Sequence, residues 1–205
     1  MKKPDKLIFG FVIGGVFPIL LGLLSVLLWF YLDGDEKRPV FYLICGLLIG
    51  IIINLKYLKG WIKHRFNLHL WFLALIYIFY NIFLYGFFMG FPVFNVLLGL
   101  LVGYYIGNRI YYNKIQPAIR HDLIRRVSLF TAYVMTLICV SSAIIGLSDE
   151  TIGENIRLMF KLDFEITKVM IVLIIIVGGP GLIALQYFIT KFSAIRTLRF
   201  IEGKP

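Results

Sequence analysis

The stretch from Leu7 to Leu32, LIFGFVIGGVFPILLGLLSVLLWFYL, contains no Asp, Glu, Lys or Arg. A helix needs about 20 consecutive apolar residues to cross the hydrocarbon core of a bilayer. This run is longer than the apolar part of a usual signal peptide and lacks a small-x-small cleavage site. We therefore expect it to be a retained membrane-spanning helix.

The composition of the whole chain supports a membrane protein. Its 205 residues are 60% apolar, 17% aromatic and only 16% charged, whereas a soluble domain is about 45–50% apolar and about 25% charged. Too few polar residues remain to cover so much apolar surface in water. Lipid must form part of the solvent.

A 41-residue block, Leu68–Asn108, is too long for one span and contains a cluster of turn-forming residues at Gly86, Gly90, Pro92 and Asn95. These residues divide it into two helices joined by a tight turn. We predict an all-α, polytopic integral membrane protein, a six-transmembrane-helix bundle in a single transmembrane domain, 1–205. Its predicted spans are 7–32, 40–55, 68–86, 90–108, 127–147 and 169–189.

The charges between these spans predict an orientation. With the N-terminus inside, the inner segments hold 16 of the 21 Lys and Arg residues and 3 of the 11 Asp and Glu residues. The positive-inside rule then places both termini in the cytoplasm, and we expect a multi-pass plasma (inner) membrane protein. The basic excess is explained by anionic lipid headgroups, so we expect no nucleic-acid partner.

Segment 152–164 places apolar residues at helical spacing opposite charged ones. This pattern is typical of a short helix that lies on the outer interface of the membrane. A loop folded over the bundle is the alternative.

Glycines recur at helical spacing on three of the predicted spans, where they allow neighbouring backbones to approach closely. Packing within the bundle is the simpler interpretation, and homo-oligomerisation or contact with partner membrane subunits is the alternative. The glycines of these faces are Gly10, Gly14, Gly46, Gly50, Gly99, Gly103 and Gly107.

The sequence Gly178-Gly179-Pro180-Gly181 lies near the middle of the sixth span. Because proline removes a backbone donor and glycine weakens a helix, we expect either a break or a kink there. Unwound backbone at that depth is tolerated only inside protein or beside a cavity, so a break would be a candidate solute site. The first span has a milder version at Gly14-Gly15-x-x-Pro18.

Uncharged polar residues form two seams, one along the third span and one along the fifth, and Gln186 lies on the sixth span. Such groups commonly join helices by hydrogen bonds, and they would line a pocket if one is present. The predicted substrate-binding residues are Tyr77, Asn81, Tyr85, Thr131, Ser142, Gly178, Gly179 and Gln186.

No charged residue lies inside a predicted span, which argues against a proton relay. No sequence motif of a hydrolase, metalloprotease or phosphate-binding loop is present, so we predict no catalytic residue, no metal and no cofactor. His64, His69 and His121 all fall on the inner side and would have to form the site of any membrane enzyme.

The short outer loops leave no room for a soluble catalytic domain. We therefore expect a small-solute membrane transporter or the solute-binding membrane subunit of a transport system. The alternative is a non-catalytic accessory or assembly subunit of a membrane complex.

Overall fold

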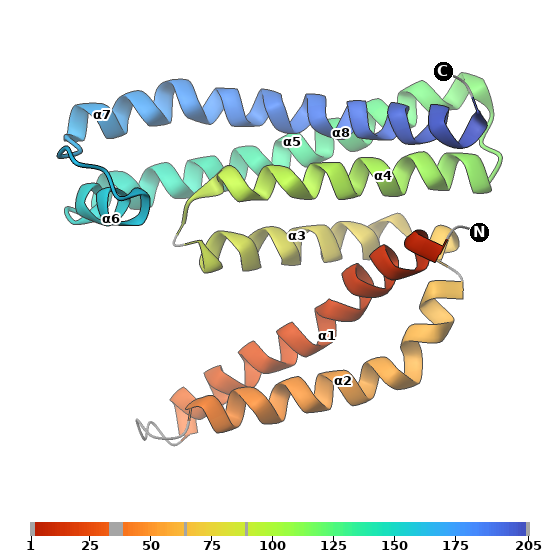
Figure 1. The fold of residues 1–205 in the computed structure, drawn as a ribbon, viewed down its shortest axis with the longest axis horizontal. Coiled ribbons are helices and arrows are strands. Elements are labelled where there is room, and N and C mark those ends of the chain that lie inside the picture. Colours follow the sequence, from red (N-terminus) through yellow and green to blue (C-terminus); the bar gives the residue numbers. More distant parts are fainter. Residues whose placement is uncertain (1–2, 33–38, 64, 89, 204–205) are drawn as a thin grey trace. The chain divides into compact units, whose positions relative to one another are not determined.

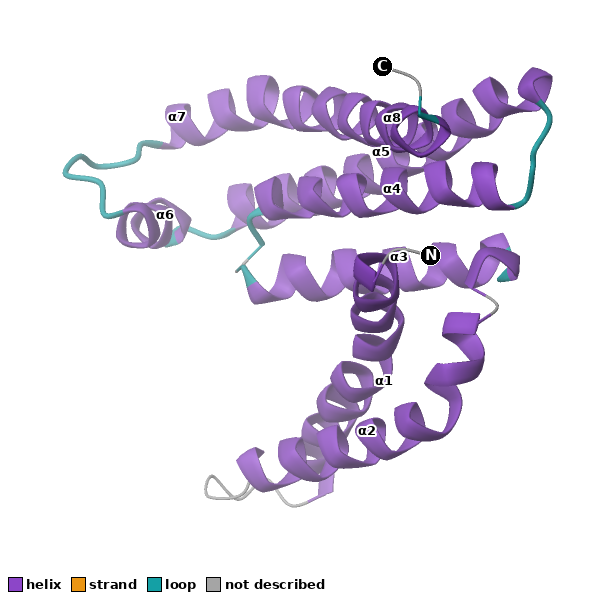
Figure 2. Ribbon diagram, turned by 45° about the vertical axis from the view of Figure 1, so that its right-hand side comes forward, coloured by secondary structure: helices purple, strands orange, loops and turns teal. Residues whose placement is uncertain are grey.

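The computed structural model describes residues 3–32, 39–63, 65–88 and 90–203, and this part of the chain is helical with no strand (Figures 1 and 2). The first predicted outer loop, 33–38, and His64 lie outside the described residues. In chain order the elements are α1 (Lys3–Leu32), α2 (Pro39–Lys63), η1 (Arg65–Asn67), α3 (Leu70–Phe87), η2 (Pro92–Asn95), α4 (Val96–Tyr112), α5 (Pro117–Ser148), α6 (Ile152–Phe160), α7 (Lys168–Leu173), η3 (Ile174–Gly178) and α8 (Gly179–Glu202).

Six helical segments are long and apolar enough to cross a membrane, which confirms the predicted number of spans. They are Phe9–Leu32, Pro39–Leu58, Leu70–Phe87, Pro92–Tyr112, Pro117–Ser148 and Lys168–Glu202. The last two extend beyond the predicted apolar runs, because Arg and Lys are good helix formers and the backbone continues past the charged boundary. Pro117 begins α5 at a position where its missing N–H costs no intrahelical bond.

The short helix predicted over 152–164 is α6, which ends at Phe160 rather than 164. It stops because Lys161 adopts a left-handed conformation, with φ 50° and ψ 48°. The chain then continues without helix until Lys168.

Contacts divide the chain into two compact units, Met1–Phe79 and Tyr80–Pro205. The boundary falls within α3.

In the first unit, α1 packs closely against α2 through two of the predicted glycines. A methyl group added at Gly46 would overlap the Leu21 carbonyl, and one added at Gly50 would overlap the backbone of Pro18. The Ser25 hydroxyl, which also contacts the Gly46 position, lies 2.7 Å from the Tyr42 carbonyl oxygen. Only glycine therefore permits this approach of the two backbones.

Pro18 lies inside α1, which continues through it to Leu32. A proline has no N–H to donate to the carbonyl four residues earlier, so the Gly14 carbonyl loses its helical partner. The side-chain amide of Asn54 on α2 donates to this carbonyl. Asn54 is buried, and the polar contact between helices thus replaces the missing backbone bond.

In the second unit, α4, α5 and the continuous α7–η3–α8 helix run side by side, and α6 lies across the end at which α5 finishes (Figures 1 and 2). The α4 glycines face α8. A methyl group at Gly107 would lie 2.7 Å from the Ala194 carbonyl oxygen, and one at Gly99 would lie 2.8 Å from the Thr190 hydroxyl. The added methyl at Gly103 would overlap the Thr190 carbonyl.

At the opposite end of this unit, Arg120 joins three segments. Its Nε donates to the Ile115 carbonyl at 2.7 Å, and its Nη1 lies 2.6 Å from Glu202 Oε1. This side chain connects the loop before α5, α5 itself and the end of α8.

The predicted glycine faces of α2 and α4 therefore contact helices of the same chain. Gly10 and Gly14 are less tightly enclosed, with a side-chain atom of α2 at 3.5 and 3.3 Å from the added methyl group. That one of these faces also joins copies of the chain or partner subunits stays a prediction.

The Gly103→Ala substitution should lower the free energy of unfolding by about 1–3 kcal/mol, because the methyl group forces α4 away from α8. Gly86→Ala is the matched control, since nothing lies within 4 Å of a methyl group there, and it should be neutral or slightly stabilising. Helical circular dichroism during unfolding in mild detergent measures both. Equal effects would show that α4 and α8 do not pack in this way.

Asn54→Ala should lower the free energy of unfolding by about 1–2 kcal/mol, because it leaves the Gly14 carbonyl without a donor. In a Pro18→Ala background, the N–H of residue 18 can donate to the Gly14 carbonyl. Asn54→Ala should then lower the free energy of unfolding by clearly less. A double-mutant cycle measured by unfolding tests this coupling. Additive effects of the two changes would contradict the proposed replacement.

Candidate solute-binding cavity

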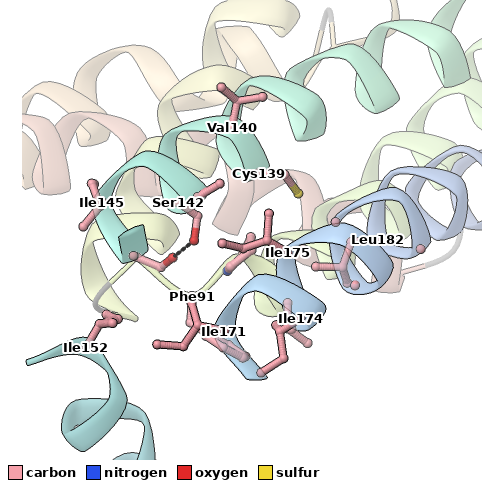
Figure 3. A pocket seen from close by; sticks show the side chains of 18 of the residues that line it. Phe91, Cys139, Val140, Ser142, Ile145, Ile152, Ile171, Ile174, Ile175 and Leu182 are labelled. Atoms are coloured by element: carbon pink, nitrogen blue, oxygen red, sulfur yellow. Dashed lines mark hydrogen bonds between the residues drawn. The ribbon is translucent and has the colours of Figure 1, made fainter. Parts of the chain in front are cut away.

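A cavity of about 480 Å³ lies within the second unit, in the range of about 300–1,000 Å³ typical of small-molecule sites. Its walls come from four parts of the chain (Figure 3). They are residues 90–93 between α3 and α4, and residues drawn from 136–146 of α5, 152–156 of α6 and 171–183 of the α7–η3–α8 helix.

The walls are mostly branched aliphatic side chains, with Phe91 and Pro92 from the turn before α4. Ile171, Ile174 and Ile175 face the cavity from one side, and Ile145 and Ser142 come from α5 (Figure 3). None of the described lining residues carries a charge. The cavity therefore suits a ligand, or part of one, that is itself apolar.

The hydroxyl and amide side chains of the lining already have hydrogen-bond partners. The Ser142 hydroxyl donates to the Gly90 carbonyl at 2.8 Å (Figure 3), and the Thr136 hydroxyl donates to the Ala132 carbonyl at 3.0 Å. The Asn155 amide donates to the Thr151 hydroxyl at 3.3 Å. A strongly polar solute would lose its hydration in this cavity without gaining donors in return.

Besides Gly90, which has a φ of 80° in the turn before α4, glycines 146, 178, 179 and 181 line the cavity. A methyl group added at Gly146, Gly179 or Gly181 would meet nothing within 4 Å, and one at Gly178 would make only an ordinary 3.8 Å contact with Ile174. None of the four has a positive φ. Neither close packing nor an unusual backbone conformation requires glycine here, and the space beside these four positions is open.

The helix around Pro180 is not unwound, so the structure does not show the break that was one of the two alternatives expected there. Five residues, Ile174–Gly178, form a π-helical turn, and α8 begins directly after them. The turn shifts the hydrogen-bond register, and Pro180 falls in the first turn of α8, where a missing N–H is tolerated. Free carbonyls are costly at this depth, and single π-helical turns frequently occur at functional sites.

Three of the eight predicted substrate-binding residues, Ser142, Gly178 and Gly179, line this cavity. The other five are not among its lining residues. They lie in two polar clusters and on α3.

The first polar cluster joins α3 to the start of α4. The Asn95 side-chain amide donates to the backbone carbonyl of Asn81 at 2.8 Å and to its Oδ1 at 3.1 Å. Both asparagines are fully buried. The sequence indicates only that Asn95 is a turn residue. The structure shows that its side chain also hydrogen-bonds to Asn81.

The second cluster is a buried seam between α5 and α8. The hydroxyl oxygens of Thr131 and Thr190 lie 3.0 Å apart, and Thr190 also donates to the carbonyl of Gln186 at 2.9 Å. Gln186 and Thr131 are fully buried, and the amide of Gln186 covers Gly99 of α4. This arrangement joins three helices of the second unit.

The remaining predicted residues, Tyr77 and Tyr85, lie two turns apart on α3. Tyr77 is buried. The hydroxyl of Tyr85 is buried beside the Gly90 turn and near the Ser142 hydroxyl, without hydrogen-bond geometry between them. That the five residues outside the lining contact a solute stays a prediction.

Sequence reasoning missed the aliphatic majority of the lining. Ile152 and Ile156 belong to the apolar side of the helix predicted over 152–164, and both line the cavity. The signal for Phe91 and Pro92 was their position in a turn directly before a span. No pattern in the sequence distinguishes Ile171 or Ile175 from lipid-facing residues.

A hydrogen-bonded turn leads from α5 into α6. The hydroxyl and the backbone N–H of Thr151 donate to Asp149 Oδ1 at 2.7 and 2.8 Å. These bonds stabilise the carboxylate and hold the pKa of Asp149 below its ordinary value. The turn fixes the start of α6 beside the cavity.

In the described part of the chain, no group of three or more His, Cys, Asp or Glu side chains is placed to hold a metal ion. His69 and His121 are exposed. Cys139 lines the cavity, and Cys45 belongs to the first unit.

No protein-family model, curated protein or solved structure matches this chain.

If the α5–α8 seam only joins helices, Thr131→Val and Thr190→Val should each lower the free energy of unfolding by about 0.6–1.7 kcal/mol. The double variant should cost less than the sum, because both changes remove the same bond. Neither should change the small molecules that co-purify with the chain, as measured by native mass spectrometry. Loss of a bound molecule at unchanged stability would instead make the seam part of the site.

Proposed function

We propose that this chain binds a small, mainly apolar molecule in the cavity beside the π-helical turn. It acts as a small-solute membrane transporter or as the solute-binding membrane subunit of a transport system. The proposal rests on the cavity itself. At four of the glycines that line it, no close neighbour excludes a larger side chain.

The two uses of glycine in the second unit support a binding role. At Gly99, Gly103 and Gly107 the missing side chain is replaced by atoms of α8, which is the usual role of small residues between membrane helices. At glycines 146, 178, 179 and 181, no neighbouring atom occupies the position of the missing side chain so closely. Each helix-interior glycine costs about 0.5–1 kcal/mol relative to alanine, so the free volume is maintained at a cost in stability.

The charges of the second unit support an orientation for the cavity. The end at which α5 begins carries Arg120, Arg125 and Arg126, and the end of α8 adds Arg196 and Arg199. By the positive-inside rule this end, and with it the C-terminus, faces the cytoplasm of a plasma membrane. α6 lies at the opposite end of this unit (Figure 1), so the cavity that α6 helps to line then lies in the outer half of the bilayer.

Gly179→Leu and Gly181→Leu should each reduce the amount of a co-purifying small molecule by about tenfold or more. A leucine side chain placed in the free volume displaces at least two buried methylene groups of a ligand, at about 0.8 kcal/mol each. Native mass spectrometry of the chain purified in mild detergent measures the retained molecule. Gly86→Leu is the matched control, because it adds the same side chain in open space away from the cavity.

Equal retention by all three variants would contradict a site in this cavity. A stoichiometric protein partner with no bound small molecule would overturn the proposal and favour an accessory subunit.

A further inference from the structure

The open side of the cavity lies on membrane-spanning segments. Val93, Val140, Ile145 and Ile174 line it and are 42–52% exposed. All four fall within segments long and apolar enough to cross a membrane. Their exposed surface is therefore available to the hydrocarbon core of the bilayer, and an apolar molecule can reach the cavity sideways without passing through water.

We propose that the ligand is a lipid of the surrounding bilayer, with one acyl chain inserted into the cavity between α5 and the π-helical turn. This inference rests on the proposed function and names its ligand class. The partnered hydroxyls of Ser142 and Thr136 and the uncharged walls offer little to a sugar, amino acid or ion. An acyl chain needs only apolar contact and keeps its headgroup at the interface.

The position of α6 fits the headgroup end of such a lipid. Ile152 and Ile156 line the cavity, whereas Glu154 and Arg157 form an ion pair with 3.8 Å between their charged atoms. α6 lies across the end of the helices (Figure 1), as expected of an amphipathic helix at the membrane surface. The headgroup would lie beside its polar residues while the chain runs inward past Ile156.

The charges near α6 favour a headgroup without net negative charge. Segment 148–168 holds five acidic residues against three basic ones. An anionic headgroup would therefore be repelled, and a zwitterionic one would be accepted.

The test is photo-crosslinking of the full chain in vesicles that contain phosphatidylcholine with a diazirine in one acyl chain. Peptide mass spectrometry should place crosslinks on residues 136–146 and 171–183 more strongly than on the exposed faces of α1 and α2. Gly179→Leu should reduce the crosslinks at 136–146 about tenfold, and Gly86→Leu should leave them unchanged. Phosphatidylglycerol with the same chain should crosslink there less.

Gly181→Leu serves as a second cavity variant in case Gly179→Leu does not fold. The helical circular dichroism of each cavity variant must match that of the Gly86→Leu control. Crosslinks spread evenly over exposed apolar residues and unaffected by either cavity variant would overturn the lipid inference. If Gly179→Leu then still causes the loss of a non-lipid solute, the proposed function stands and only the lipid inference is wrong. If the binding of no molecule depends on Gly179 or Gly181, the proposed function and the lipid inference are both wrong.

Discussion

The structure depends on one constraint, that no backbone carbonyl can be left without a partner where water is absent. Two prolines challenge it, one in each unit. Pro18 frees the Gly14 carbonyl, and Asn54 of the neighbouring helix supplies the donor. Pro180 is accommodated instead by five π-helical residues that place it in the first turn of α8. The first solution couples two helices, and the second reshapes one helix beside a cavity.

The glycines also differ in their roles, since some lie at close contacts between helices and others lie beside the cavity. Gly46 and Gly50 allow α2 to contact α1, and three glycines of α4 do the same for α8. The α4–α8 contacts, together with the Thr131–Thr190 bond and the Arg120–Glu202 ion pair, hold the second unit together along its length. The glycines beside the π-helical turn make no such contacts. These contacts leave the cavity beside the π-helical turn unfilled, and on the proposed function a ligand binds there without separating the helices.

The spans were predictable from sequence, because a run such as Leu7–Leu32 has no alternative in water and the cluster around Pro92 has to interrupt a 41-residue apolar block. The polar partners were not. Asn54 lies at the end of its predicted span, and its role exists only because Pro18 is 36 positions away in sequence and adjacent in space. Likewise, polar residues such as Asn81 and Thr131 signalled a solute site, yet they meet Asn95 and Thr190. The cavity is lined by isoleucines that resemble any lipid-facing residue, so only tertiary structure distinguishes them.

If the volume between α5 and the π-helical turn is a ligand site, a bound molecule should be visible there. A crystal structure of the full chain grown in a lipidic mesophase tests this most directly. We expect elongated density for a bound molecule between Ser142 and Gly179, with the π-helical turn in place. A structure in which α5 has closed onto α8, so that protein side chains fill this volume, would contradict it.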